Sequence, residues 1–273
     1  MPKNETIEVE VDFTDREAVD ALEKEAATAR FATFDIETGP VHNIEELIPW
    51  FDPPELPGDF DPKTVAIGNL KDQAKIDAKI EAARAKHVDA VTNYAATYAD
   101  ALAAHREKFI SNAALSPLTG RVLAAGILRL DQFFIWTAET EAEEAELLSN
   151  VWGQMLDFRD KTLVGFCIEN FDLPFLITRS RLLGVRVPQF VRPDITRRYY
   201  SPLFIDLQLV WTLGDPKAFV KLNTVASHLK AGQKSGDGAD FATTFFADRP
   251  SAIEYLKTDL SLTRRVGWRL GIR

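Results

Sequence analysis

The stretch that decides the fold is FATFDIETGP, residues 31–40. It is rich in β-branched and aromatic side chains and stops at Gly39-Pro40, which predicts a strand followed by a turn. Side chains two residues apart on a strand point to the same face, so Asp35 and Glu37 converge. Carboxylates in an apolar strand are costly unless a cation compensates them, so this pair is a candidate metal site.

The segments before the second predicted strand differ in composition. Residues 1–30 are polar and acidic, with a strand-like pattern over 7–13 and a helical pattern over 18–29, and we expect a leader packed on the core. Residues 40–68 are rich in proline and aromatic residues, which indicates an ordered loop packed by its own side chains. Residues from about 69 to 111 are alanine-rich and charged without Pro or Gly, which predicts an insertion of one or two long helices.

The remaining segments alternate between strand and helix patterns. The predicted elements are an antiparallel strand pair (121–130 and 132–139), a helix (141–157), a buried strand (161–168), a helix from 171 to 185, a strand or strand–helix junction (204–213) and helices from 222 onward. This order predicts an α/β domain over 31–273, with a mixed sheet.

Charge and cysteine content limit the function classes. The 273 residues carry 41 acids and 32 bases, a net charge of −9, which argues at first sight against a polyanion-binding protein. However, residues 1–60 carry −12 and residues 173–273 carry +8, so the C-terminal third could face an anion. A single cysteine and the absence of a signal-like or membrane-spanning stretch lead us to expect a cytoplasmic protein that does not bind membranes.

Two further acids lie in structured contexts. Asp172 opens a predicted helix in NFDLPFL, where it could instead be an ordinary N-cap. Asp259 follows Tyr255 by four residues in YLKTD, so the phenol and the carboxylate share one face of a helix, although such a pair could also lie at the surface. Four converging carboxylates are stable only around divalent cations, and ligation by oxygen alone favours Mg²⁺ or Mn²⁺. Two such ions can activate water and stabilise a leaving oxygen, which indicates phosphodiester hydrolysis.

The order of these motifs carries a resemblance. FDIET, NFDLPFL and YLKTD, roughly 140 and 85 residues apart, resemble the three motifs of the DEDD superfamily of 3′–5′ exonucleases. The tyrosine before the last aspartate resembles the DEDDy branch, which includes ribonuclease D and the proofreading domains of family B DNA polymerases. The phrases LSPLTGRVLAAGI, LVGF, FIDLQLVW, KSGDGADF and YLKTDLSLT are most similar to stand-alone predicted exonucleases related to those proofreading domains.

The resemblance implies a fold and a set of roles. The fold is ribonuclease H-like, a mixed five-stranded sheet flanked by helices, with two divalent cations, Mg or Mn, as cofactors. Asp35 would bridge both ions, Glu37 and Asp259 would bind the ion that activates water, Asp172 would support the second ion, and Tyr255 would orient the water. The residues expected to contact substrate are Thr38, Gly39, Phe171 and Arg179, the last because it follows Asp172 in an arginine-rich stretch.

Several residues have two interpretations. Many relatives have Asn where this chain has Cys167, so a contact to substrate or a supporting hydrogen bond could be missing. Asp206 lies in an apolar strand, and its neighbours match a structural position that supports the site without binding metal. Trp50, Phe51 and Phe60 could stack on unpaired bases, and packing within the loop is at least as good an interpretation.

The leading hypothesis is a metal-dependent 3′–5′ exonuclease acting on DNA, with single strands favoured. DNA is favoured over RNA as the nucleic-acid partner, and replication or repair proteins are possible further partners. The alternatives are a 3′–5′ exoribonuclease of the same branch, since no reader of the 2′-hydroxyl is evident, and a non-catalytic nucleic-acid-binding protein that retains the fold.

Overall fold

The structure is a computed structural model that describes residues 16–159, 161–191, 203–215, 217–234, 236 and 238–273. The chain forms two compact units, one from the residues up to 41 together with 114–273, and one from residues 42–113. The strand-like stretch 7–13 lies outside the described residues.

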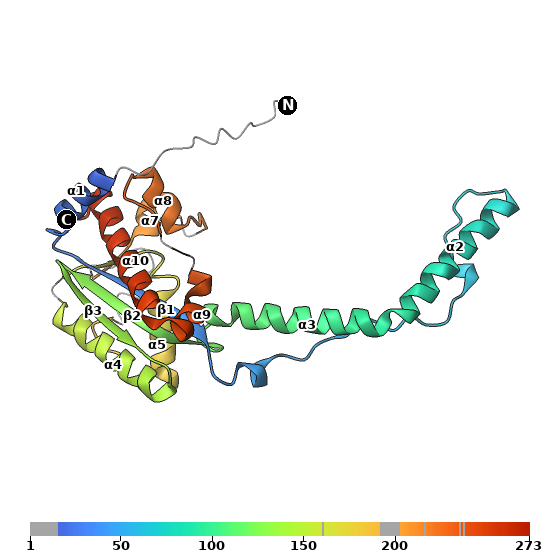
Figure 1. The fold of residues 1–273 in the computed structure, drawn as a ribbon, viewed down its shortest axis with the longest axis horizontal. Helices are drawn as coiled ribbons and strands as arrows, with labels where there is room; N and C mark the ends of the chain where they lie inside the picture. The colour runs from blue at the N-terminus through green and yellow to red at the C-terminus, as the bar shows by residue number, and fades with distance from the viewer. Residues whose placement is uncertain (1–15, 160, 192–202, 216, 235, 237) are drawn as a thin grey trace, which may run out of the picture. The chain divides into compact units, whose positions relative to one another are not determined.

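The first unit is built on one mixed sheet (Figure 1). Its strands are β1 (Ala32–Pro40), β2 (Gly120–Arg129), β3 (Gln132–Thr137), β4 (Leu163–Gly165) and β5 (Phe204–Asp206). Their order is β3-β2-β1-β4-β5. The pairs β3–β2 and β2–β1 are antiparallel, and the pairs β1–β4 and β4–β5 are parallel. The predicted mixed five-stranded sheet is therefore confirmed.

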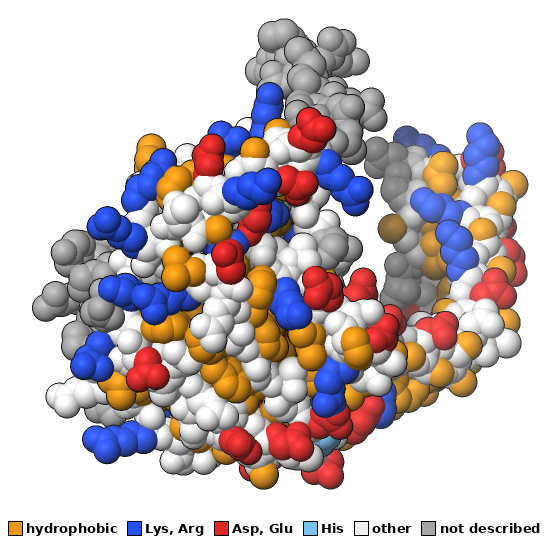
Figure 2. All heavy atoms as spheres, turned by 60° about the vertical axis from the view of Figure 1, so that its left-hand side comes forward, with side chains coloured by type: hydrophobic (Ala, Val, Ile, Leu, Met, Phe, Trp, Pro, Cys, Tyr) orange, Lys and Arg blue, Asp and Glu red, His pale blue; other side chains and the backbone are white. Residues whose placement is uncertain are grey.

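Helices cover both faces of this sheet (Figure 1). The helices of this unit, with three short 3₁₀ or α turns, are α1 (Arg16–Ala26), η3 (Ala113–Leu115), α4 (Glu141–Asp157), α5 (Asp172–Leu182), α7 (Leu207–Trp211), α8 (Leu222–His228), η4 (Gly238–Asp240), α9 (Phe241–Ala247) and α10 (Arg249–Arg269). Phe34 and Ile36 of β1 pack with α4 and α5 on one face. Leu123 of β2 packs with α9 and α10 on the other. Charged side chains of both signs are spread over the face shown in Figure 2.

The alternation along β1 separates a core face from a polar face. Phe34 and Ile36 are buried in the core between the sheet and α4 and α5. The residues between them point the other way, and the hydroxyl of Thr33 donates to the carbonyl oxygen of Leu260 in α10 at 3.1 Å. Asp35 and Glu37 share that face with Thr33, so they point toward α10.

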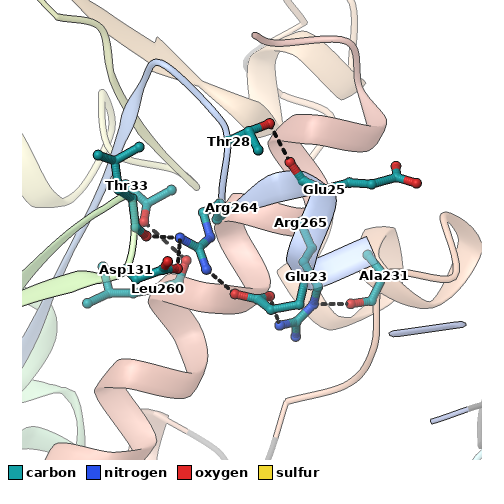
Figure 3. Close-up of polar contacts among 10 residues, drawn as sticks. Glu23, Glu25, Thr28, Thr33, Asp131, Ala231, Leu260, Arg264 and Arg265 are labelled. Carbon is teal, nitrogen blue, oxygen red and sulfur yellow. Dashed lines mark hydrogen bonds and ion pairs between the residues drawn. The ribbon is translucent and has the colours of Figure 1, made fainter. Parts of the chain in front are cut away.

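The helix α1 is held against α10 by buried charge (Figure 3). Leu22 packs into the core cluster that includes Leu262 and Val266. The carboxylate of Glu23 accepts hydrogen bonds from Arg264 and from Arg265, the latter at 2.6 Å between Nη1 and Oε2. A single carboxylate on α1 thus pairs with two arginines of α10, which fixes where the helix lies.

The second unit contains two long helices and an extended segment. Its elements are η1 (Ile44–Leu47), η2 (Pro62–Thr64), α2 (Gln73–Thr92) and α3 (Tyr94–Asn112), which agree with the predicted helical insertion. The extended segment packs on the helices rather than only on itself. The ring of Phe51 lies 5.3 Å from that of His105, and the ring of Phe60 lies 5.6 Å from that of His87. Trp50 is 87% exposed.

Among the described helices, none has the length and apolar character that crossing a membrane requires.

Candidate active site

The parallel strands β1 and β4 separate early, and this opens the site. Their pairing runs only from Ala32 with Leu163 to Thr33 with Val164. Beyond Thr33, the main-chain N–H of Ile36 donates to Oδ1 of Asp172 at 3.0 Å. Crevices at the carboxyl ends of separating strands are the usual ligand sites of open α/β sheets.

Asp172 therefore has a role other than helix capping. The N-cap residue of α5 is Phe171, and Asp172 is the first residue of the helix. Its buried carboxylate binds the backbone of β1, so the interpretation as an ordinary N-cap is wrong. The contact places the start of α5 directly beside the strand that carries Asp35 and Glu37.

The helix α10 brings the remaining acid to the same place. Leu256 and Leu260 are buried against the sheet, and this orients the face that carries Tyr255 and Asp259. One carboxylate oxygen from each of Asp35, Glu37 and Asp259 lies within 4.8 Å of the others. Segments more than 200 residues apart in sequence thus contribute to one acidic cluster.

The electrostatics of the cluster follow from its burial. Desolvation, followed by repulsion from Glu37, Asp172 and Asp259, raises the pKa of Asp35 well above its ordinary range. Desolvation likewise raises the pKa of Glu37 and, against the opposing effect of Lys234, that of Asp259. Burial raises the pKa of Asp172 to about 7, although hydrogen bonds from backbone N–H groups oppose the shift. These carboxylates ionise together only if positive charge is brought to them.

Lys234 brings part of that charge, and sequence reasoning assigned it no role. Its Nζ lies 2.5 Å from Oδ2 of Asp259 and 2.7 Å from the hydroxyl oxygen of Tyr255. Burial lowers the pKa of Lys234, but Asp259, the hydrogen bond to Tyr255 and Asp35 together raise it above its ordinary value. The sequence signal that could have identified Lys234 was its position in KSGDGADF, at the start of a glycine-rich segment. This segment packs closely on Tyr255, since a Cβ at Gly236 would lie 3.3 Å from the tyrosine ring.

The residues present fit a divalent cation. The buried Oδ1 of Asp259 has no hydrogen-bond partner among the described residues, although it lies within the acidic cluster. The three groups of that cluster offer only carboxylate oxygens, the donors that hard cations such as Mg²⁺ and Mn²⁺ prefer. The cluster could therefore hold such an ion, with Asp35, Glu37 and Asp259 as ligands.

A cleft of about 560 Å³ opens beside the cluster. Its lining includes Asp35, Asp259 and Lys234, together with the apolar side chains of Phe166, Phe219 and Leu222. Phe219 is 70% exposed. Apolar walls with a few polar groups converging at one point are typical of small-ligand sites, and this volume suits one or two nucleotides rather than a duplex.

Asp206 shapes the loop that forms one side of the cleft. Its buried carboxylate accepts hydrogen bonds from the main-chain N–H groups of Cys167 at 2.8 Å, Glu169 at 3.1 Å and Gln208 at 2.9 Å. Cys167 has a φ of 65°, a left-handed conformation that is rare for residues other than Gly and Asn. Asp206 thus holds a strained loop that leads from β4 to Asp172.

Three expected substrate contacts have packing roles in the structure. The hydroxyl of Thr38 donates to the carbonyl oxygen of Ala114 at 2.7 Å. A Cβ at Gly39 would lie 2.5 Å from Leu123, so a larger residue would collide with β2. Phe171 is partly buried against the core, with its ring 5.5 Å from that of Phe175.

The expectation that Arg179 contacts substrate is wrong. Arg179 is 6% exposed, and its Nε and Nη2 donate to Glu144 at 2.8 and 2.6 Å. Glu144 is fully buried and also accepts from the N–H of Val122 at 2.9 Å. The guanidinium is therefore used to neutralise a buried carboxylate that ties α4 to α5 and β2. Arg192, Arg197 and Arg198 of the same arginine-rich stretch lie outside the described residues.

Comparison with known proteins gives a family match. The model of a family described as predicted 3′–5′ exonucleases related to the exonuclease domain of PolB matches residues 106–266, more than half of the chain. The matched stretch contains Asp172, Lys234, Tyr255 and Asp259. Asp35 and Glu37 lie before it, and the pairing of β1 with β2 and β4 brings them to the other two acids, Asp172 and Asp259.

Solved structures match the chain as well, and one of them is similar in part. It is the family B DNA polymerase from the hyperthermophilic archaeon Pyrobaculum calidifontis, with 20% sequence identity and a TM-score of 0.47. The similarity covers 59% of this chain and 23% of that chain. No curated protein matches the sequence.

Proposed function

We propose that this protein releases nucleotides from the 3′ end of single-stranded DNA. The premise is that the chain belongs to the family of predicted 3′–5′ exonucleases related to the exonuclease domain of PolB. The reaction is metal-dependent hydrolysis of the terminal phosphodiester. The observation that carries this proposal is the convergence of Asp35, Glu37 and Asp259 beside a cleft with an apolar wall.

The acidic residues divide between two cation positions. Asp35, Glu37 and Asp259 would hold one divalent ion, and Asp35 with Asp172 would hold the second. When bound, Mg²⁺ or Mn²⁺ ions supply Lewis acidity toward the attacking water and the leaving oxygen. The raised pKa values of these carboxyl groups support this assignment, because such a cluster keeps its charges only with cations nearby.

Tyr255 and Lys234 act on the reacting groups from α10 and from the glycine-rich loop. Burial, followed by the charges of Glu37 and Asp259, raises the pKa of Tyr255, so its hydroxyl keeps its proton at neutral pH and can orient a water molecule. The ammonium of Lys234 lines the cleft, where it can bind a phosphate oxygen and stabilise the charge that develops on it.

The proposal is tested with an oligonucleotide of about 20 nucleotides labelled at its 5′ end, as DNA and as RNA. With Mn²⁺ or Mg²⁺, a ladder of products that shorten one nucleotide at a time is expected from the single-stranded DNA. Glu37→Gln should slow the reaction by about 100-fold or more, since it removes the negative charge of a cation ligand. Glu146→Gln, an exposed residue of α4, is the matched control and should leave the rate unchanged.

Three results would overturn the proposal: no product with either ion, equal rates for the two variants, or cleavage within the chain rather than from its 3′ end. Shortening of the RNA but not of the DNA would assign the site to an exoribonuclease.

A further inference from the structure

An unbroken run of five residues, 219–223, lines the cleft beside the acidic cluster. This 219–223 segment leads into α8 and has the sequence FVKLN. It shares the cleft with Asp35, Asp259 and Lys234. None of its five residues was expected from the sequence to contact substrate, so what the segment does in the cleft is a separate question.

Alternate residues of the 219–223 segment are anchored in the core. Val220 and Leu222 pack against the hydrophobic cluster that α8 and α10 share. Lys221, between them, is exposed and has an extended backbone, with φ −81° and ψ 145°. Neighbouring side chains of an extended segment point to opposite sides. The anchoring of Val220 and Leu222 therefore turns Phe219 and Lys221 away from the core.

A hydrogen bond ties the segment to the acidic cluster. Oδ1 of Asn223 accepts a hydrogen bond from the main-chain N–H of Lys234 at 2.9 Å. The Nζ of Lys234 in turn lies 2.5 Å from Oδ2 of Asp259. The segment is thus connected to the acids by two successive polar contacts, which fix where it lies relative to them.

Phe219 offers an accessible aromatic ring in this cleft. Its side chain is mostly exposed, whereas Phe166, which also lines the cleft, packs against a core cluster. Among the described residues, no ring or cation stacks on Phe219. A single exposed Phe is ordinary at a protein surface. This one is different because it lies in the cleft that contains Asp35 and Asp259.

The chemistry of the segment favours a nucleotide as the ligand. An aromatic face stacks on any nucleobase, because every base has a π face. Lys221 adds a positive charge two residues away, and it forms no ion pair with any described residue. A ring and an ammonium in one cleft match the base and the phosphate of a nucleotide, whereas a purely apolar ligand would leave the ammonium without a partner.

We infer that the ring of Phe219 stacks on an unpaired base at the 3′ end of the strand, while Lys221 binds a neighbouring phosphate. The inference rests on the proposed function for where the strand lies. It goes beyond that function because it assigns the recognition of the base, and it implies that a 3′ end without bases is a poor ligand.

The test combines two proteins with two strands. Binding of a 5′-labelled oligothymidylate of about eight nucleotides is measured by fluorescence anisotropy, in EDTA so that no hydrolysis occurs. The second strand is identical except that its last two nucleotides lack their bases. Phe219→Ala should weaken binding of the complete strand by about 10-fold and change binding of the abasic strand by less than about 2-fold. Loss of the ring and loss of the bases should therefore not add.

Two further variants separate stacking from apolar contact. Phe219→Trp should bind the complete strand at least as tightly as wild type, because it keeps an aromatic face. Phe219→Leu keeps an apolar side chain without a ring and should lose about 5-fold. Leu213→Ala is the matched control, since Leu213 is 95% exposed and lies outside the lining of the cleft, and it should bind as wild type. Equal urea midpoints for Phe219→Ala and wild type check that folding is unchanged.

The role of Lys221 is measured by salt dependence. For Lys221→Gln, the slope of log K against log salt should fall by about 0.7 with both strands, since one phosphate contact is lost. Lys217→Gln, an exposed residue outside the lining, should keep the wild-type slope. An unchanged slope for Lys221→Gln, or equal changes for the two variants, would remove Lys221 from the site.

Four outcomes overturn the role of Phe219: a wild-type chain that does not bind the complete strand, equal losses of Phe219→Ala on both strands, wild-type binding by Phe219→Leu, or an equal loss for Leu213→Ala. Hydrolysis is scored separately, by the product ladder with Mn²⁺. The non-additive loss without a ladder would keep the base site and remove the exonuclease assignment. A ladder without the non-additive loss would do the reverse.

Discussion

The ammonium of Lys234 lies 2.5 Å from a carboxylate oxygen of Asp259, inside a cluster of buried acids. Asp259 itself is 2% exposed, so neither water nor salt screens this pair fully. Lys234 is therefore the internal positive charge that the acidic cluster relies on when no divalent ion is present.

Replacement of this lysine should destabilise the metal-free protein. We expect Lys234→Met to lower the free energy of unfolding in EDTA by about 2 kcal/mol, because a buried charge-assisted hydrogen bond is lost. Added Mn²⁺ should recover part of the loss, since the ion replaces the missing positive charge. Urea unfolding measures both effects. Lys257→Met, at the surface of the same α10, is the control, and equal losses for both variants would contradict the prediction.

The stability of the metal-free protein should fall as the pH rises, because folding raises the pKa of a buried carboxyl group. The pKa of Asp172 is about 7 in the folded state, whereas in the unfolded chain it lies near 3.8. The folded state therefore holds the proton more tightly, and this stabilisation is fully present below about pH 3.8 and lost as the pH rises toward 7. Urea midpoints in EDTA should fall from pH 5 to pH 7. Asp172→Asn should flatten the fall, and an unchanged slope in that variant would refute the assignment.

The left-handed backbone at Cys167 predicts a stabilising substitution. Asn tolerates a φ of 65° better than Cys, so Cys167→Asn should raise the free energy of unfolding by about 1 kcal/mol. Burial, with the nearby Asp206 and Asp172, raises the pKa of the thiol to about 12. Labelling by iodoacetamide at pH 8 should therefore be slow until the protein is unfolded. Rapid labelling of the folded chain, or a less stable Asn variant, would show that the conformation is different.

The three backbone hydrogen bonds to Asp206 predict a positioning role. Asp206→Ala leaves three main-chain N–H groups without their acceptor, and we expect a loss of stability of about 3 kcal/mol together with a lower kcat. Asp206→Asn keeps one acceptor oxygen and should fall between Ala and wild type. Asp215→Ala serves for comparison, because it removes one exposed hydrogen bond, from the main-chain N–H of Lys217 to the Asp215 carboxylate. Wild-type rates in the Ala variant would exclude an influence of this loop on the site.

The burial of Arg179 predicts a folding defect without a binding defect. Arg179→Met leaves Glu144 buried without its cation, which should cost about 3–5 kcal/mol. Arg181→Met, two residues later and exposed, should change stability by less than about 0.5 kcal/mol. At temperatures where Arg179→Met is still folded, its affinity for oligonucleotides should equal that of wild type. A selective loss of affinity would restore Arg179 as a substrate contact.

Local patterns were sufficient for most of the fold. The helix over 141–157 and the pair of strands around Asp131 follow from periodicity and turn residues, and the structure has both. The junction at 204–213 is a three-residue strand that runs into α7, as its sequence allows. These elements could be predicted because their patterns depend on residues close together in the chain.

For the candidate site, the sequence determined the chemistry and tertiary structure decided the partners. Spacing alone places Asp35 beside Glu37 and Tyr255 beside Asp259, since strand and helix geometry fix residues two or four apart. Two pairings depend on how the elements pack. Lys234 reaches Asp259 because the glycine-rich loop lies against α10, and Arg179 turns to Glu144 instead of the cleft because α5 lies against α4. Long flexible side chains pair with whatever opposite charge burial leaves within reach, and only the packed structure decides which one that is.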